Sequence, residues 1–265
     1  MHAGAGTRSF PFPGQSVIIS YRLIILMMKV LAIETSTYSG GIAVSEDDRI
    51  LGEYYLNMGP SHSERLVPAI DRLLGELEIE GKELGGVAVS LGPGSFTALR
   101  VGISTAKGLA YSLGIPVTGA SSLEILAMNL PFSPFQVCAL TDARKGELFA
   151  ALFRTAAGGV SRISEDAILS PAGLMEIIKE ETIFIGEGAL LYRDFLEDNV
   201  LGGEAIRICP PYLNYPRASS LAFYGFKRFT EGHADEVLGL APMYIRKPDA
   251  ELTAKGRQDD RIGHN

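Results

Sequence analysis

The sequence predicts an α/β protein built from two related lobes with a cleft between them. Short apolar runs typical of strands alternate with longer stretches of helical periodicity, and each half of the chain places its strands before its helices. A proline-containing stretch at 131–134 separates the two halves. Hydrophobic residues make up 46% of the 265 residues, which is enough to bury a core in each lobe.

The first half begins with three predicted strands, at 30–33, 40–45 and 50–56, joined by polar turns as in a meander. A helix then begins near Ser63, because apolar side chains such as Leu66 and Ile70 recur at helical spacing.

A fourth strand at 86–91 leads into the loop Gly92-Pro93-Gly94-Ser95 and a second helix. Gly114 is expected to end this helix in the left-handed conformation. A short strand at 115–119 and a helix that opens at Ser121 follow.

The sequence of the second half predicts a hairpin of two strands, followed by three helices and one further strand. The strands lie at 137–141, 147–153 and 183–188, and the helices at 171–180, 189–196 and 219–231. We expect an N-terminal lobe at 28–130, a C-terminal lobe at 131–253 and a flexible polar tail at 254–265.

Residues 1–27 are expected to be a non-native or disordered extension. The apolar run at 17–28 is shorter than the roughly 20 residues that a membrane-spanning helix needs, and no small-residue cleavage site follows it. We therefore expect the true first residue to be Met27 or Met28, and a cytoplasmic protein with no membrane partner.

The charge balance argues against direct binding of nucleic acid. Asp and Glu outnumber Lys and Arg by 31 to 24, which gives a net charge of −7. Neutralisation of phosphates supplies most non-specific affinity for nucleic acid, so an acidic chain binds it poorly by itself. Cys138 and Cys209 are too few for a disulfide framework.

The loop Gly92-Pro93-Gly94-Ser95 leaves two functions open. Free amides at a helix start favour an anion, so the loop is a candidate phosphate loop. Alternatively, its glycines only shape a tight corner between strand and helix. The lysine-containing P-loop pattern is absent.

The second helix carries small residues at every fourth position, namely Ala98, Gly102, Ala106 and Ala110. Such a stripe lets another helix approach closely, either within the same lobe or in a second subunit, and the spacing does not decide between them. With Ser63, Leu66 and Ile70 of the preceding helix, these residues form our candidate partner interface.

Residues for acid–base, nucleophilic or metal chemistry are sparse. None of the histidines has metal-ligand spacing to another; they are His2, His62, His233 and His264. Glu34 and Asp142 are isolated carboxylates at predicted strand ends, where structural roles are more common. We assign no catalytic residue and no metal ligand.

Several segments resemble the TsaB (YeaZ) family. They are the opening MKVLAIETST at 28–37, the helix start HSERLVP at 62–68 and the loop and helix GPGSFTALRVG at 92–102. Asp142-Ala143-Arg144 with Glu147, and Gly186-Glu187-Gly188, are similar to later landmarks of the family. The resemblance covers about 28–250 and is more specific in the first half.

The resemblance implies a two-lobed actin-like (ASKHA) fold with mixed sheets and flanking helices. It also implies that the chain is not an enzyme by itself. It would be a subunit of the machinery that forms N6-threonylcarbamoyladenosine next to the anticodon, in tRNAs reading codons that start with A. Family members bind and activate the catalytic subunit TsaD through the two helices of the N-terminal lobe, in a four-helix bundle.

The resemblance also sets expectations for the other partners and for ligands. A small ATPase, TsaE, completes the set, and a homodimer forms when TsaD is absent. tRNA is expected to be reached only through the complex. No cofactor is expected to be held tightly, and nucleotide is expected to bind weakly or at the partner interface.

Two positions depart from the related patterns. TsaD-like proteins carry two metal-binding histidines where this chain has Ser122 and Leu126, which cannot hold a catalytic transition metal. Ala98 replaces the glycine usual in the family loop and adds a methyl group there. The enzymatic alternatives are a free-standing ASKHA phosphotransferase or ATPase that uses Gly92 to Gly94, and, with less support, a metallopeptidase.

Overall fold

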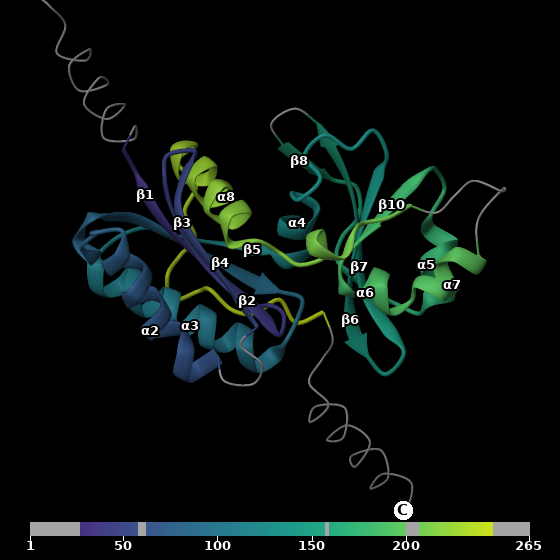
Figure 1. Cartoon of the computed structure of the whole chain (residues 1–265), viewed down its shortest axis with the longest axis horizontal. Helices are drawn as coiled ribbons and strands as arrows, with labels where there is room; N and C mark the ends of the chain where they lie inside the picture. Colours follow the sequence, from purple (N-terminus) through teal and green to yellow (C-terminus); the bar gives the residue numbers. More distant parts are fainter. Residues whose placement is uncertain (1–26, 58–61, 157–158, 200–206, 246–265) are drawn as a thin grey trace, which may run out of the picture.

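The computed structural model describes residues 27–57, 62–156, 159–199 and 207–245, which form two lobes side by side (Figure 1). The expected extension at 1–27, apart from Met27, and the expected tail at 254–265 lie outside these residues. Within the described part, no helix is long and apolar enough to cross a membrane.

The first lobe is built on a five-stranded mixed sheet with the order β3-β2-β1-β4-β5. Its strands are β1 (Lys29–Glu34), β2 (Ser39–Glu46), β3 (Arg49–Asn57), β4 (Leu84–Gly92) and β5 (Val117–Ser121). The predicted meander forms β1 to β3, and β4 runs parallel to both β1 and β5. The carboxyl ends of β1, β4 and β5 therefore meet at one edge of the sheet.

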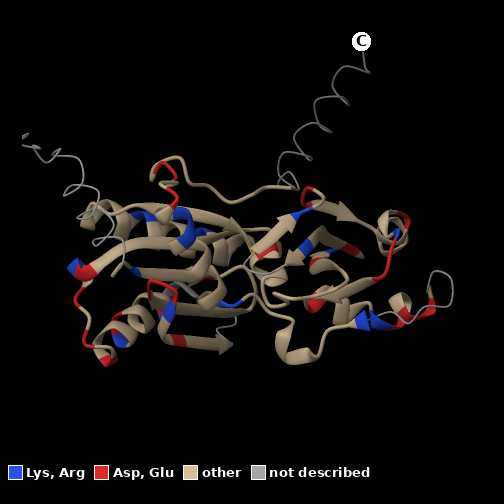
Figure 2. Ribbon diagram, turned by 90° about the horizontal axis from the view of Figure 1, so that it is seen from above, with Lys and Arg blue, Asp and Glu red and all other residues tan. Residues whose placement is uncertain are grey.

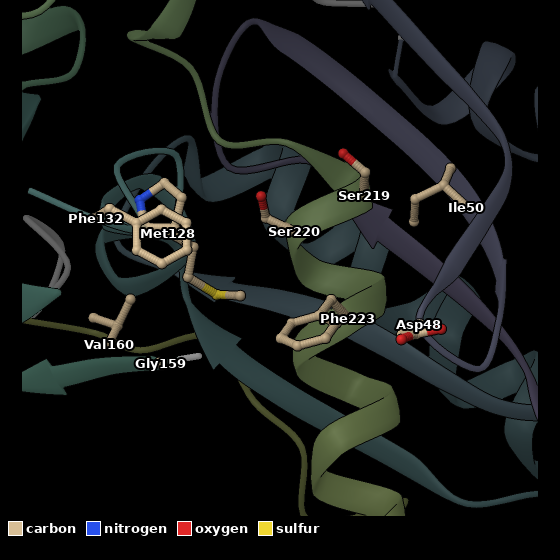
Figure 3. A pocket seen from close by; sticks show the side chains of 10 residues that line it. Asp48, Ile50, Met128, Phe132, Gly159, Val160, Ser219, Ser220 and Phe223 are labelled. Atoms are coloured by element: carbon tan, nitrogen blue, oxygen red, sulfur yellow. The ribbon is translucent and has the colours of Figure 1, made fainter. Parts of the chain in front are cut away.

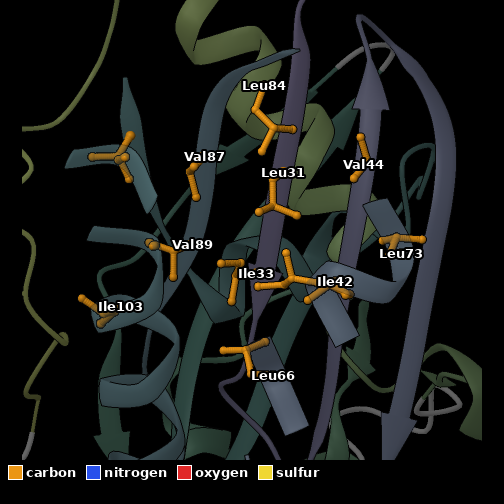
Figure 4. Close-up of a cluster of buried hydrophobic side chains, with 14 of the residues drawn as sticks. Leu31, Ile33, Ile42, Val44, Leu66, Leu73, Leu84, Val87, Val89 and Ile103 are labelled. Carbon is orange, nitrogen blue, oxygen red and sulfur yellow. The ribbon is translucent and has the colours of Figure 1, made fainter. Parts of the chain in front are cut away.

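Helices α2 (His62–Glu76) and α3 (Phe96–Leu113) cover one face of this sheet. Figure 4 shows the core between them, where Leu31 and Ile33 of β1 meet Leu66 and Ile103 of the helices. Each fully buried side chain of this kind contributes about 1.5–3 kcal/mol. Gly114 ends α3 with φ 66°, which confirms the predicted left-handed cap.

Helix α8 (Ala218–Thr230) covers the other face of the same sheet (Figure 1). It falls within the range expected for the C-terminal lobe, 131–253, but it packs on the first lobe. The reason is that this face presents small apolar side chains, including Val30, Ala32 and Ala88, which pack against Leu221 and Ala222 of the helix. The chain therefore returns to the first lobe after completing the second.

The second lobe contains a sheet with the order β11-β10-β6-β7-β8, and β9 also pairs with β7. Its strands are β6 (Gln136–Arg144), β7 (Glu147–Ala156), β8 (Gly159–Arg162), β9 (Ala167–Leu169), β10 (Thr182–Ile185) and β11 (Arg207–Ile208). Helices α5 (Pro171–Ile177), α6 (Glu187–Leu191) and α7 (Arg193–Asp198) pack on one face, against Cys138 and Leu140. The predicted helix at 189–196 is thus two short helices.

Helix α4 (Ser122–Ala127) lies between the lobes. Ile125 packs with the α8 side of the first sheet, whereas Leu123 and Leu126 pack with Phe153 of the second sheet. The side chains of Leu123, Ile125 and Leu126 are all fully buried. A packed helix, and not only a linker, therefore joins the lobes.

After α8 the chain wraps around the edge strand β5, in a segment we call the C-terminal strap (residues 235–244). Asp235 bridges to Val117 of β5. On the other side of the sheet, Lys107 Nζ of α3 donates to the carbonyls of Leu238 and Leu240, at 2.8 and 3.2 Å. The strap therefore connects the α8 face of the lobe to the α3 face.

Candidate functional site

The turns that follow β1, β4 and β5 contact one another at the carboxyl edge of the first sheet. The Ser95 amide donates to the Ser36 carbonyl at 2.7 Å. The Ser122 hydroxyl, at the start of α4, donates to the Pro93 carbonyl. Backbone groups of the candidate phosphate loop are thus bonded to the protein itself.

The loop glycine Gly94 fits closely against the turn after β1. A Cβ atom at this position would lie 2.1 Å from the Ser36 carbonyl oxygen, a distance no side chain tolerates. Gly92 and Pro93 are buried. This geometry matches the second alternative for Gly92, Pro93, Gly94 and Ser95, a tight corner between strand and helix, because the protein's own carbonyl uses the Ser95 amide.

Glu34 ends β1 beside this corner and is fully buried. Its Oε1 atom accepts from the Ser36 amide at 2.6 Å, and its Oε2 atom has no hydrogen-bond partner among the described residues. Burial raises the pKa of Glu34 above its ordinary value, and the hydrogen bonds with Ser36 and Ser90 only partly oppose this. The carboxyl group is therefore enclosed by the protein and not exposed to solvent.

The two lobes also touch through their first hairpins. Arg144, at the β6–β7 turn, places Nη2 3.4 Å from the Tyr38 hydroxyl and its guanidinium 5.7 Å from the centre of that ring. Arg144 also pairs with Asp142 at 3.1 Å. Nearby, burial raises the pKa of Glu187, and the charge of Asp142 raises it further. The sequence did not indicate this contact, since it joins residues 106 positions apart.

The small-residue stripe of α3 points inward. Ala98, Gly102, Ala106 and Ala110 are all buried. A Cβ atom on Gly102 would lie 2.2 Å from Thr35 Oγ1, so this glycine lets α3 approach the turn after β1 closely. Of the two alternatives for the stripe, the structure has packing within the same lobe. These side chains are not available at the surface of the chain.

The candidate residues of α2 divide in the same way. Leu66 and Ile70 are 0% and 5% exposed and belong to the core of the first lobe. Ser63 lies in the first turn of α2. Leu66 and Ile70 are therefore core residues of the first lobe and are not presented at its surface.

A second stripe of α3 faces outward, and the sequence analysis missed it. Its residues Thr97, Arg100, Ser104, Gly108 and Tyr111 are all exposed. An open hollow of about 430 Å³ lies along its first half. Thr97, Ser104 and Gly108 also recur at helical spacing, so this outward stripe could have been recognised in the sequence beside the stripe of Ala98, Gly102, Ala106 and Ala110.

A pocket of about 370 Å³ lies between the lobes on the α8 side. Figure 3 shows Phe223 of α8 close to Met128, with Phe132 and Val160 from the second lobe on one side and Asp48 on the other. Phe132 is 74% exposed. Asp48 is the one charged residue among the described residues that line the pocket.

Within the described residues, no group of three or more His, Cys, Asp or Glu could hold a metal ion. Ser122 and Leu126, the two positions that the sequence analysis compared with metal-binding histidines, are both fully buried. Lysine, arginine, aspartate and glutamate are scattered over both lobes (Figure 2).

Comparisons by family profile, by sequence and by structure each find similar proteins. The family profile described as TsaD, tRNA N6-adenosine threonylcarbamoyltransferase, matches residues 56–254. The tRNA threonylcarbamoyladenosine biosynthesis protein TsaB of Bacillus subtilis is 36% identical over 227 residues, 84% of this chain and 96% of the relative. The Escherichia coli TsaB is 27% identical over 240 residues, 87% of this chain and 100% of the relative. The structure of YeaZ from Pseudomonas aeruginosa superposes with a TM-score of 0.69 at 26% identity, covering 82% of this chain and 100% of that one.

Proposed function

Because the chain belongs to the TsaB (YeaZ) family of tRNA threonylcarbamoyladenosine biosynthesis proteins, we propose that it acts in this pathway as a non-catalytic subunit. In this proposal it binds and activates a TsaD-type catalytic subunit. A TsaE-type ATPase completes the complex, and tRNA is reached only through the complex. A homodimer takes the place of the heterodimer when the catalytic subunit is absent.

The exposed side chains on the outer surface of α2 and α3 are the main structural support for this proposal. Val67 of α2 and Tyr111 of α3 are 58% and 76% exposed, and in this proposal both side chains become buried against the partner. Ser104 and Gly108 lie between larger residues along α3, so a second helix could pack closely there. The docking surface in this proposal is the outward stripe of α3 with the exposed side of α2.

The contacts of the glycine loop Gly92-Pro93-Gly94-Ser95 support a non-catalytic role for this chain. The Ser95 amide is already bonded to Ser36, and the Ser122 hydroxyl to Pro93. A phosphate would have to displace these bonds. We therefore propose that nucleotide binds this chain weakly, or only where the partner adds groups.

Association of the full chain with its co-expressed TsaD-type partner tests the docking surface. Ser104→Tyr places a ring in the hollow beside α3 and should weaken the complex at least about tenfold. Ser161→Tyr makes the same change at an exposed position of β8 in the second lobe and should leave association unchanged. Equal association of the two variants with the partner would contradict docking on this surface.

A tRNA modification assay that omits each subunit in turn tests the non-catalytic role. Activity should require both chains. Transfer of the carbamoyl group by this chain alone would overturn the proposal. Turnover of ATP by the isolated chain in a calorimeter would favour the phosphotransferase alternative, and a tightly held metal in elemental analysis would favour the metallopeptidase alternative.

A further inference from the structure

Helix α3 is a cationic element in an acidic protein. Over Phe96–Leu113 it contains Arg100 and Lys107 and no acidic residue, whereas the whole chain has a net charge of −7. Lys107 donates to the carbonyls of the C-terminal strap. Arg100 is exposed, and no carboxylate among the described residues lies within ion-pair distance of it. It is thus a surface cation without a described counter-charge.

The guanidinium of Arg100 is nevertheless held in one place. Its central carbon lies 3.8 Å from the centre of the Phe96 ring. Its Nε and Nη2 atoms donate to the Tyr244 hydroxyl at 3.3 and 3.2 Å. Tyr244 is in turn positioned by the strap, where the Met243 amide donates to the Leu91 carbonyl at 2.8 Å. No described residue accepts a hydrogen bond from Nη1.

Such an arrangement suits recognition of a carboxylate. A guanidinium that is stacked on a ring and bonded along one edge loses less conformational freedom when its remaining donors are used. The hollow beside it is lined by Thr97, Val101 and Ser104, which can take the carbon stem of an incoming side chain.

We infer that Arg100 binds a carboxylate on a helix of the partner protein, and that Tyr244 is a positioning residue that fixes the guanidinium for it. The inference rests on the proposed docking surface and specifies its chemistry. A protein carboxylate is favoured over a nucleic-acid phosphate because the cation stands alone beside exposed apolar side chains, such as Phe96 at 43% exposure, and not within a basic patch.

The test measures the Kd between the full chain and its TsaD-type partner at low and high salt. Arg100→Glu should weaken binding on the order of 100-fold, because it replaces an attraction at the interface by a repulsion. Arg100→Lys should retain part of the affinity. Tyr244→Phe should weaken binding several-fold and flatten its salt dependence. Lys179→Glu, which reverses the charge of an exposed residue in the second lobe, is the control and should change nothing.

The outcomes separate the two proposals. If the wild-type chain binds its partner and Arg100→Glu binds within twofold at every salt concentration, the inference is overturned and the docking surface stands. If the wild-type chain does not bind, both fail. If Arg100→Glu weakens only the binding of tRNA to the isolated chain, the inference that Arg100 binds a protein carboxylate is overturned. Rescue of Arg100→Glu by a single acid-to-arginine change in the partner would establish it.

Discussion

Two glycines of α3 offer a paired test of how this helix packs. Gly102→Ala adds a methyl group where a Cβ atom would lie 2.2 Å from Thr35 Oγ1 and 3.3 Å from Thr35 Cβ. Gly108→Ala adds the same group where nothing lies within 4 Å. Both positions are inside the same helix, so the change in backbone freedom is matched.

The expected free energies follow from this geometry. Replacing glycine by alanine inside a helix stabilises it by about 0.5–1 kcal/mol, and Gly108→Ala should gain that amount. Gly102→Ala should gain the same amount and lose about 1–3 kcal/mol to overpacking against Thr35. The two variants should therefore differ by about 1–3 kcal/mol in the free energy of unfolding.

Urea denaturation with equal m-values measures this difference. Thr35→Ala removes the obstructing hydroxyl, which has no hydrogen-bond partner among the described residues, and should recover much of the loss in the double variant. If Gly102→Ala and Gly108→Ala are equally stable, or if Thr35→Ala recovers nothing, then α3 does not pack against Thr35 as described.

Three further changes have defined outcomes. Because burial raises the native pKa of Glu34 above its ordinary value of 4.5, its favourable contribution is complete at low pH and is lost as pH rises. In pH-dependent unfolding, Glu34→Gln should therefore gain stability relative to wild type as the pH rises above 4.5; a constant difference would contradict this. Ala106→Phe, at a position 0% exposed, should lower stability by about 3 kcal/mol in thermal unfolding, whereas an unchanged melting temperature would place Ala106 at the surface. Asn214→Ala leaves the Gly186 amide and the Cys209 and Pro210 carbonyls without their partner, and should cost about 2–4 kcal/mol in urea; a smaller loss would mean that water replaces the amide.

The order of strands and helices in the first lobe was predictable because each element has a strong local pattern. The strands are short apolar runs, and Gly114 stops α3 where a left-handed residue is needed. The same patterns could not say which stripe of α3 is buried. Both stripes contain small residues at helical spacing, and only the structure places Gly102 against Thr35, which comes from a distant part of the chain.

The contacts made by the last part of the chain also could not be predicted from the sequence. Helix α8 has an ordinary amphipathic pattern, which indicates a buried face without naming the sheet that receives it. The strap has little regular structure, so no periodicity marks its contact with α3. The placement of Arg100 depends on Tyr244, 144 positions away, and no local pattern links the two.

The return of the chain to the first lobe has a consequence for synthesis. The nascent polypeptide completes the first sheet by residue 121, yet the helix that covers Val30 and Ala88 begins only at residue 218. Until that point leaves the ribosome, one apolar face of the sheet stays open to chaperones or to aggregation. A fragment that ends at residue 130 would keep this face exposed, so we expect it to aggregate and not to fold by itself.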